Sequence, residues 1–137
     1  MIIGKVLYLG EDYLFIKCLE PHIDKDFILN NVDNLDDAYK WLDSVVGEKN
    51  VLMVDGENAS IDAFELHNTL NEKGWLVKNL FVLLLNESKP PISAKAFEIG
   101  IDDLLVKTLN FEDIILRIQY LSYLRVKRLD YNTLNAD

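Results

Sequence analysis

The chain has 137 residues, 50% of them hydrophobic and 27% charged, with a formal net charge of −9. This composition is typical of one globular domain and unlike that of a disordered chain. The negative charge would repel a phosphate backbone, so we expect no nucleic-acid binding by this domain. Its single cysteine, Cys18, excludes an intramolecular disulfide and suits a reducing compartment. No apolar run approaches the ~18 residues of a membrane span, so we expect a cytoplasmic protein.

Strand and helix signals alternate along the chain. Short apolar runs predict strands over Lys5–Leu9, Phe27–Leu29, Val51–Val54, Leu80–Leu85 and Leu104–Val106. Helical spacing of apolar residues predicts helices over residues 13–22, 36–46, 61–73, 92–99 and 111–130. This alternation predicts an α/β fold: a doubly wound parallel sheet of five strands in the order 2-1-3-4-5, flanked by five helices.

Several residues predict where the helices end. Pro21 lacks an amide donor, so it should kink or end the first helix, and Gly47 is the stop signal of the second. The paired prolines of Lys89–Pro91 predict a loop before the fourth helix, which Gly100 closes.

Polar side chains follow four of the predicted strands. They are Glu11 after the first strand, Asp55 after the third, Asn86 after the fourth and Lys107 after the fifth. In this strand order the ends of strands one, three and five open into one crevice. Carboxylates there favour Mg²⁺. A metal ion and Lys107 together would let Asp55 accept a phosphoryl group.

Val51–Asp55 and Gly100–Lys107 resemble the receiver domain of bacterial response regulators, and the likeness spans residues 3–127. The resemblance implies a phosphorelay signalling domain, not an enzyme, that accepts a phosphoryl group on Asp55 from a histidine kinase or phosphotransfer protein. It also implies that Lys107 and Asn86 contact the phosphoryl group. Mg²⁺ would be held by Glu11, Asp55 and the backbone carbonyl of Glu57. The signal would then pass through the face formed by the fourth helix, fifth strand and fifth helix.

The chain departs from the receiver pattern at several of these positions. Gly10 replaces the first of two adjacent acids, and Asn86 replaces a Ser or Thr. Thr108 replaces the Pro that follows the Lys, so we expect a trans bond there, and Leu104 occupies the aromatic switch position. These departures support an alternative: a pseudo-receiver that serves as a phosphorylation-independent interaction or dimerisation module. An FMN-binding domain would share the strand order, but Gly10–Leu14 lacks a hydroxyl-rich phosphate loop.

The remaining candidates have structural interpretations. Cys18 is expected to be a small buried core residue, and Trp41 and Trp75 are expected to pack in the core. His22 and His67 lack partners at metal-ligand spacing, so neither predicts a metal site.

The last predicted helix is longer than the sheet requires and ends in the basic run Arg125–Arg128. We assign residues 1–130 to the receiver domain and 131–137 to a tail or the start of a linker. In a longer chain that linker would lead to an output domain such as a diguanylate cyclase, and the helix could instead pair with its copy in a homodimer.

Overall fold

The computed structural model describes residues 2–45, 50–108 and 110–134. Its strands are β1 (Gly4–Leu9), β2 (Phe27–Val32), β3 (Asn50–Asp55), β4 (Asn79–Leu85) and β5 (Asp103–Val106). Its helices are α1 (Tyr13–Ile23), α2 (Leu35–Ser44), α3 (Ala63–Glu72), the 3-10 turn η1 (Trp75–Val77), α4 (Pro90–Ile99) and α5 (Phe111–Leu134). The strands form one parallel sheet in the order β2-β1-β3-β4-β5. The predicted fold class is therefore confirmed.

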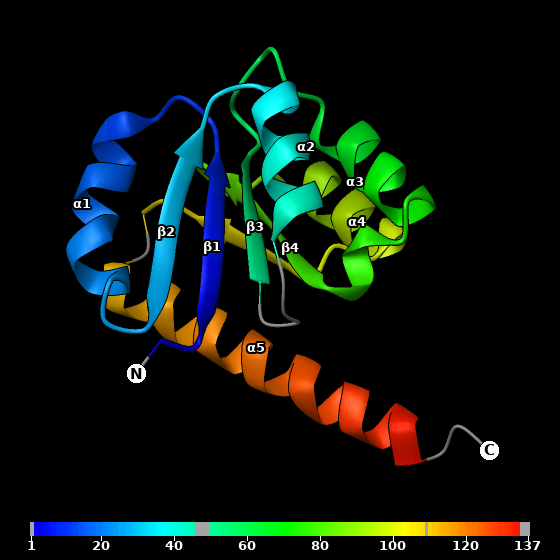
Figure 1. Cartoon of the computed structure of the whole chain (residues 1–137). Helices are drawn as coiled ribbons and strands as arrows, with labels where there is room; N and C mark the ends of the chain where they lie inside the picture. Colours follow the sequence, from blue (N-terminus) through cyan, green and yellow to red (C-terminus); the bar gives the residue numbers. More distant parts are fainter. Residues whose placement is uncertain (1, 46–49, 109, 135–137) are drawn as a thin grey trace.

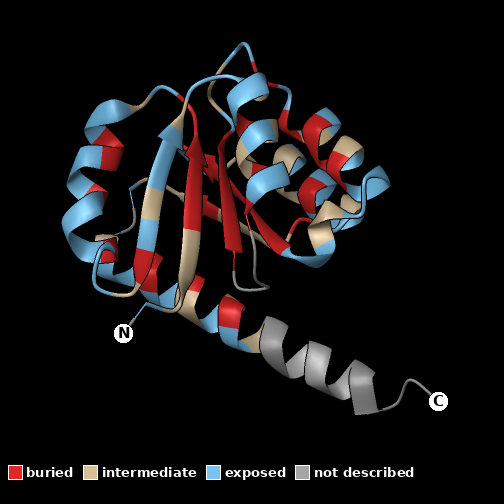
Figure 2. Ribbon diagram, in the orientation of Figure 1, coloured by how far each residue is buried: buried red, intermediate tan, exposed pale blue. Residues whose placement is uncertain are grey.

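Helices cover both faces of the sheet, α1 and α5 one face and α2, α3 and α4 the other (Figure 1). The alternation of side chains along β1 divides the core in two. Val6 and Tyr8 pack under α1 and α5, whereas Leu7 and Leu9 pack under α2 and α3. Every residue of β3 and β4 is buried, as expected of central strands in a parallel sheet (Figure 2).

Several elements differ from the prediction. β2 continues through Asn30 and Asn31 because it is an edge strand that pairs with β1 along its whole length. α1 ends two residues beyond Pro21. α4 begins at Pro90, since its two prolines occupy the first helical positions, where an amide donor is not needed. The turn η1 was not predicted.

The expectations for Cys18, the two tryptophans and Gly47 have different outcomes. Cys18 is exposed, so the prediction of a buried thiol was wrong: α1 turns Phe15, Ile16, Leu19 and Ile23 inward. Trp41 and Trp75 do pack against the core. The predicted stop signal Gly47 lies outside the described residues.

α5 continues past residue 130 to Leu134 and extends beyond the sheet (Figure 1). No helix in the described part of the chain is long and apolar enough to cross a bilayer.

Gly100 ends α4 with a φ of +90°, in the left-handed region. A Cβ added there would meet no heavy atom within 4 Å. We predict that Gly100→Ala lowers the free energy of unfolding by about 1–2 kcal/mol, because a Cβ disfavours this backbone conformation. Gly100→Asn should cost less, since asparagine tolerates the same region. Urea unfolding of both variants tests this, and equal losses would contradict the backbone explanation.

Candidate functional site

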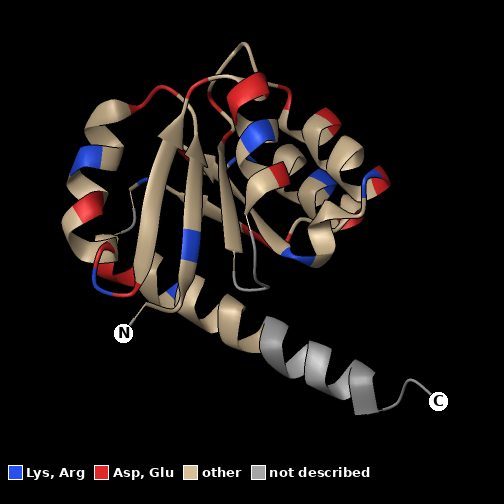
Figure 3. Cartoon of the chain, in the orientation of Figure 1, with Lys and Arg blue, Asp and Glu red and all other residues tan. Residues whose placement is uncertain are grey.

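The site lies at the carboxyl edge of the sheet, where acidic residues gather in the loops (Figure 3). A pocket of about 610 Å³ opens there. It is lined by Glu11, Asp12, Asp55, Glu57, Asn58, Ala59, Ser60, Asn86 and Lys107. The structure thus brings the predicted site residues Glu11, Asp55, Glu57, Asn86 and Lys107 to one pocket, and their individual roles remain predictions.

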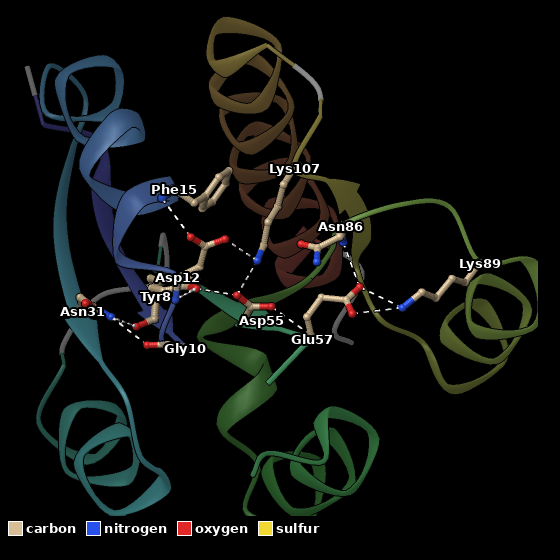
Figure 4. Close-up of polar contacts among 10 residues, drawn as sticks. All are labelled: Tyr8, Gly10, Asp12, Phe15, Asn31, Asp55, Glu57, Asn86, Lys89 and Lys107. Atoms are coloured by element: carbon tan, nitrogen blue, oxygen red, sulfur yellow. Dashed lines mark hydrogen bonds and ion pairs between the residues drawn. The ribbon is translucent and has the colours of Figure 1, made fainter. Parts of the chain in front are cut away.

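Asp55, the last residue of β3, is the buried centre of this pocket, with 3% of its surface exposed. Its Oδ2 accepts hydrogen bonds from Tyr8 Oη at 2.6 Å and from Lys107 Nζ at 2.7 Å. Its Oδ1 accepts one from the backbone N–H of Glu57 at 3.0 Å. Three donors therefore compensate the desolvation of this carboxylate (Figure 4).

Tyr8 is the residue that sequence reasoning missed. It lies on β1, fully buried, and its ring packs beside Phe15 under α1. Its Oη donates to Asp55 and accepts from the backbone N–H of Asp12 at 3.1 Å (Figure 4). A tyrosine in an apolar strand is an ordinary core residue, so nothing in the sequence signalled this role.

Gly10 leaves the space that this tyrosine fills. A Cβ built on Gly10 would lie 2.6 Å from Tyr8 Oη and 2.6 Å from Asp55 Cβ, closer than real contacts of this kind. Gly10 directly follows β1, and a side chain there would point to the face of the sheet from which Tyr8 projects, since residues two apart share a face. The position where the receiver pattern has its first acid is therefore filled by the Tyr8 hydroxyl.

Lys107 follows β5 and reaches across the pocket. Its Nζ bonds Asp55 Oδ2 and also Asp12 Oδ2 at 2.9 Å, and lies 5.6 Å from the Phe15 ring centroid. Its side chain is 10% exposed, so the ammonium is largely removed from water and held by two carboxylates. The peptide bond between Lys107 and Thr108 is trans, as predicted, and the described residues contain no cis peptide bond.

Asp12, and not Glu11, is the acid of the β1–α1 loop that reaches Lys107. The carboxylate of Asp12 also caps α1 by accepting from Phe15 N at 3.1 Å, so both of its oxygens are engaged. Glu11 lines the pocket but is exposed. Asp12 was not among the predicted site residues, because the receiver pattern places its two acids directly after the strand.

A second ion pair closes the opposite side of the pocket. Glu57 accepts from Lys89 Nζ at 3.0 Å and from the backbone N–H of Asn86 at 2.9 Å (Figure 4). The β3–α3 loop is thereby tied to the β4–α4 loop. The Glu57 carboxylate is therefore occupied by its contacts with Lys89 and the Asn86 amide.

The contacts shift the pKa values of the site. Burial, then the hydrogen bond to Asp55, raises the pKa of Tyr8, so its phenol remains a donor. The hydrogen bond from Lys107 lowers the pKa of Asp12, and the Asn86 amide with Lys89 lowers that of Glu57. Burial alone would lower the pKa of Lys107. The hydrogen bonds to Asp55 and Asp12 have the larger effect, so the pKa is raised. The site therefore holds carboxylates, an ammonium and a neutral phenol at neutral pH.

These residues do not fit a Mg²⁺ site well. Gly10 supplies no carboxylate, Asp12 is turned to Lys107, and both Asp55 oxygens already accept hydrogen bonds. Among the residues with described placement, no group of three or more His, Cys, Asp or Glu side chains is arranged to hold a metal ion.

Comparison with known proteins gives structural matches alone. No protein-family model matches the sequence, and no curated protein sequence matches it. The fold is similar to a structure described as the adenylate cyclase from Rhodopirellula baltica, with a TM-score of 0.79, 16% identity, and coverage of 100% of this chain and 99% of that chain.

Response regulators give further matches. FixJ from B. japonicum matches with a TM-score of 0.76 and 15% identity, over 91% of this chain and 60% of that chain. The receiver domain of the Francisella response regulator 1452 matches with a TM-score of 0.73 and 16% identity, over 87% of this chain and 96% of that chain. At such identities the matches establish the fold: the chain has the fold of response regulator receiver domains, as the sequence resemblance predicted.

We predict that Lys107→Met destabilises the protein strongly, by about 3–5 kcal/mol, because it leaves the buried Asp55 carboxylate without its cation. Lys89→Met is the matched control, since the Lys89–Glu57 pair is more exposed and should contribute less than about 1 kcal/mol. Chemical unfolding of both variants measures the difference. Equal losses would show that Asp55 does not depend on Lys107.

We also predict that stability falls in acid. The folded state lowers the pKa of Asp12 and Glu57, so it binds protons less tightly at these groups than the unfolded chain does. Their stabilisation is present above the unfolded values of about 4 and is lost as the pH falls through the folded values. Unfolding at a series of pH values should show this loss, and Asp12→Asn should reduce it. The same slope in Asp12→Asn and in the exposed-site control Glu98→Gln would contradict the assignment.

Proposed function

We propose that this chain is a signal-transduction receiver that works through protein contact without phosphoryl transfer, with Asp55 as a structural anchor. The proposal rests on one observation: the buried Asp55 carboxylate already accepts hydrogen bonds from three donors, one of which is the Tyr8 hydroxyl. A phosphoryl acceptor must present an oxygen to the incoming phosphorus. Here Oδ2 is already shared between a phenol and an ammonium.

The proposed contact surface is formed by α4, β5 and α5. Phe97 on α4 is 83% exposed, and a depression of about 190 Å³ lies beside it. Arg117 of α5 bonds Asp103 of β5 through two nitrogens, at 2.8 and 3.0 Å, which fixes the far side of this surface. An exposed aromatic side chain next to a rigid polar pair suits a protein partner. Partners of this class would be a kinase or phosphotransfer protein, an attached output domain, or a second copy of the chain.

The phosphorelay receiver is the second candidate. It is favoured by the 2.7 Å contact of Lys107 with Asp55 and by the open pocket above them. In that scheme a phosphohistidine of the partner would transfer its phosphoryl group to Asp55, and Lys107 and Asn86 would contact its oxygens. Mg²⁺, if bound by Glu11, Asp55 and the Glu57 carbonyl, would supply charge neutralisation. The soluble, non-enzymatic signalling role is common to both candidates.

Incubation of the wild-type protein with acetyl phosphate and Mg²⁺, followed by intact mass measurement, tests the proposal. We predict that the mass stays unchanged, because Asp55 Oδ2 is held by Tyr8 and Lys107. A receiver domain known to be phosphorylated under the same conditions is the positive control. A single phosphoryl adduct that Asp55→Ala abolishes would instead establish the phosphorelay candidate.

A further inference from the structure

We propose that Tyr8 and Gly10 form a matched pair that closes the Asp55 site to divalent cations, so that Tyr8 determines what this pocket excludes. This inference rests on the proposed function and names the residue responsible for it. The pair consists of a large side chain that brings a hydroxyl to Asp55 and a residue whose missing side chain makes room for it.

The first support is the geometry at Asp55 Oδ2. A carboxylate oxygen has two lone pairs. One accepts from Tyr8 Oη at 2.6 Å, a length typical of a strong hydrogen bond between a hydroxyl and a carboxylate, and the other accepts from Lys107 Nζ. Oδ1 accepts from the Glu57 amide. A metal ion would therefore compete with the phenol for the oxygen nearest β1.

The second support is the mutual exclusion of Tyr8 and an acid at position 10. Any Cβ at Gly10 would overlap Tyr8 Oη and crowd Asp55 Cβ. An aspartate there would provide the oxygen that hard cations prefer, but it cannot coexist with the hydroxyl. The Tyr8 hydroxyl therefore occupies space that a side chain at position 10 would need.

The third support is the anchoring of the hydroxyl. Tyr8 Oη also accepts from the Asp12 amide, and the ring is buried in the core beside Phe15. The phenol is held at both its donor and its acceptor side. It does not swing aside without breaking two hydrogen bonds and the packing of its ring.

The test is calorimetric titration of Mg²⁺ into the wild-type protein, Tyr8→Phe and Tyr8→Val, each shown to be folded by circular dichroism. We predict no saturable binding by the wild type and saturable one-site binding by both variants, because each frees a lone pair on Asp55. Adding Asp55→Asn to either variant should abolish the binding. Tyr120→Phe, which removes the hydroxyl of an exposed tyrosine on α5, is the matched control and should behave as the wild type.

Tyr8→Phe keeps the ring, so it decides the question if Tyr8→Val prevents folding. Folded Tyr8→Phe without saturable binding, or wild-type protein that binds Mg²⁺ equally well, would overturn the inference. If the wild type is inert to acetyl phosphate and the variants gain no Mg²⁺ binding, the proposed function stands and the role of Tyr8 is wrong.

Discussion

The structure depends on one buried carboxylate, that of Asp55, which is paired with Lys107. Asp55 ends the central strand β3 with almost no exposed surface, and such a group is tolerated only when donors replace its water. A phenol, an ammonium and a backbone amide do so, and they come from β1, the loop after β5 and the β3–α3 loop. The anchor therefore joins three segments that are far apart in the sequence, and it fixes the carboxyl edge of the sheet.

This anchoring is the basis of the proposal that the domain works without phosphoryl transfer. In a phosphorelay the strand-end carboxylate must be available, and the resemblance to receivers led us to expect that of Asp55. Here Tyr8 and Lys107 share its inner oxygen, Asp12 holds the other side of Lys107, and Glu57 is tied to Lys89. The acidic pocket is thus organised by internal contacts. We propose that such a domain keeps the fold of a receiver and offers its α4–β5–α5 face to protein partners.

The parts of the fold predicted well are those with strong local signals. β3 and β4 are uninterrupted apolar runs, and the polar residues after them could be placed at one edge because parallel strands share a direction. The edge strand β2 was predicted too short because Asn30 and Asn31 have low strand propensity. Cys18 was misplaced because helical spacing alone does not tell which side of the apolar stripe turns inward. Tyr8 could not be predicted, since its role depends on a contact with Asp55, 47 positions away.

The hydrogen bond between Tyr8 and Asp55 is the central claim, and a crystal structure with Mg²⁺ and beryllium fluoride tests it most directly. Beryllium fluoride mimics a phosphoryl group on an available aspartate. The account predicts that Asp55 carries no adduct and that Tyr8 Oη stays within hydrogen-bond distance of its Oδ2. A beryllium fluoride adduct on Asp55, with the Tyr8 hydroxyl displaced, would contradict it.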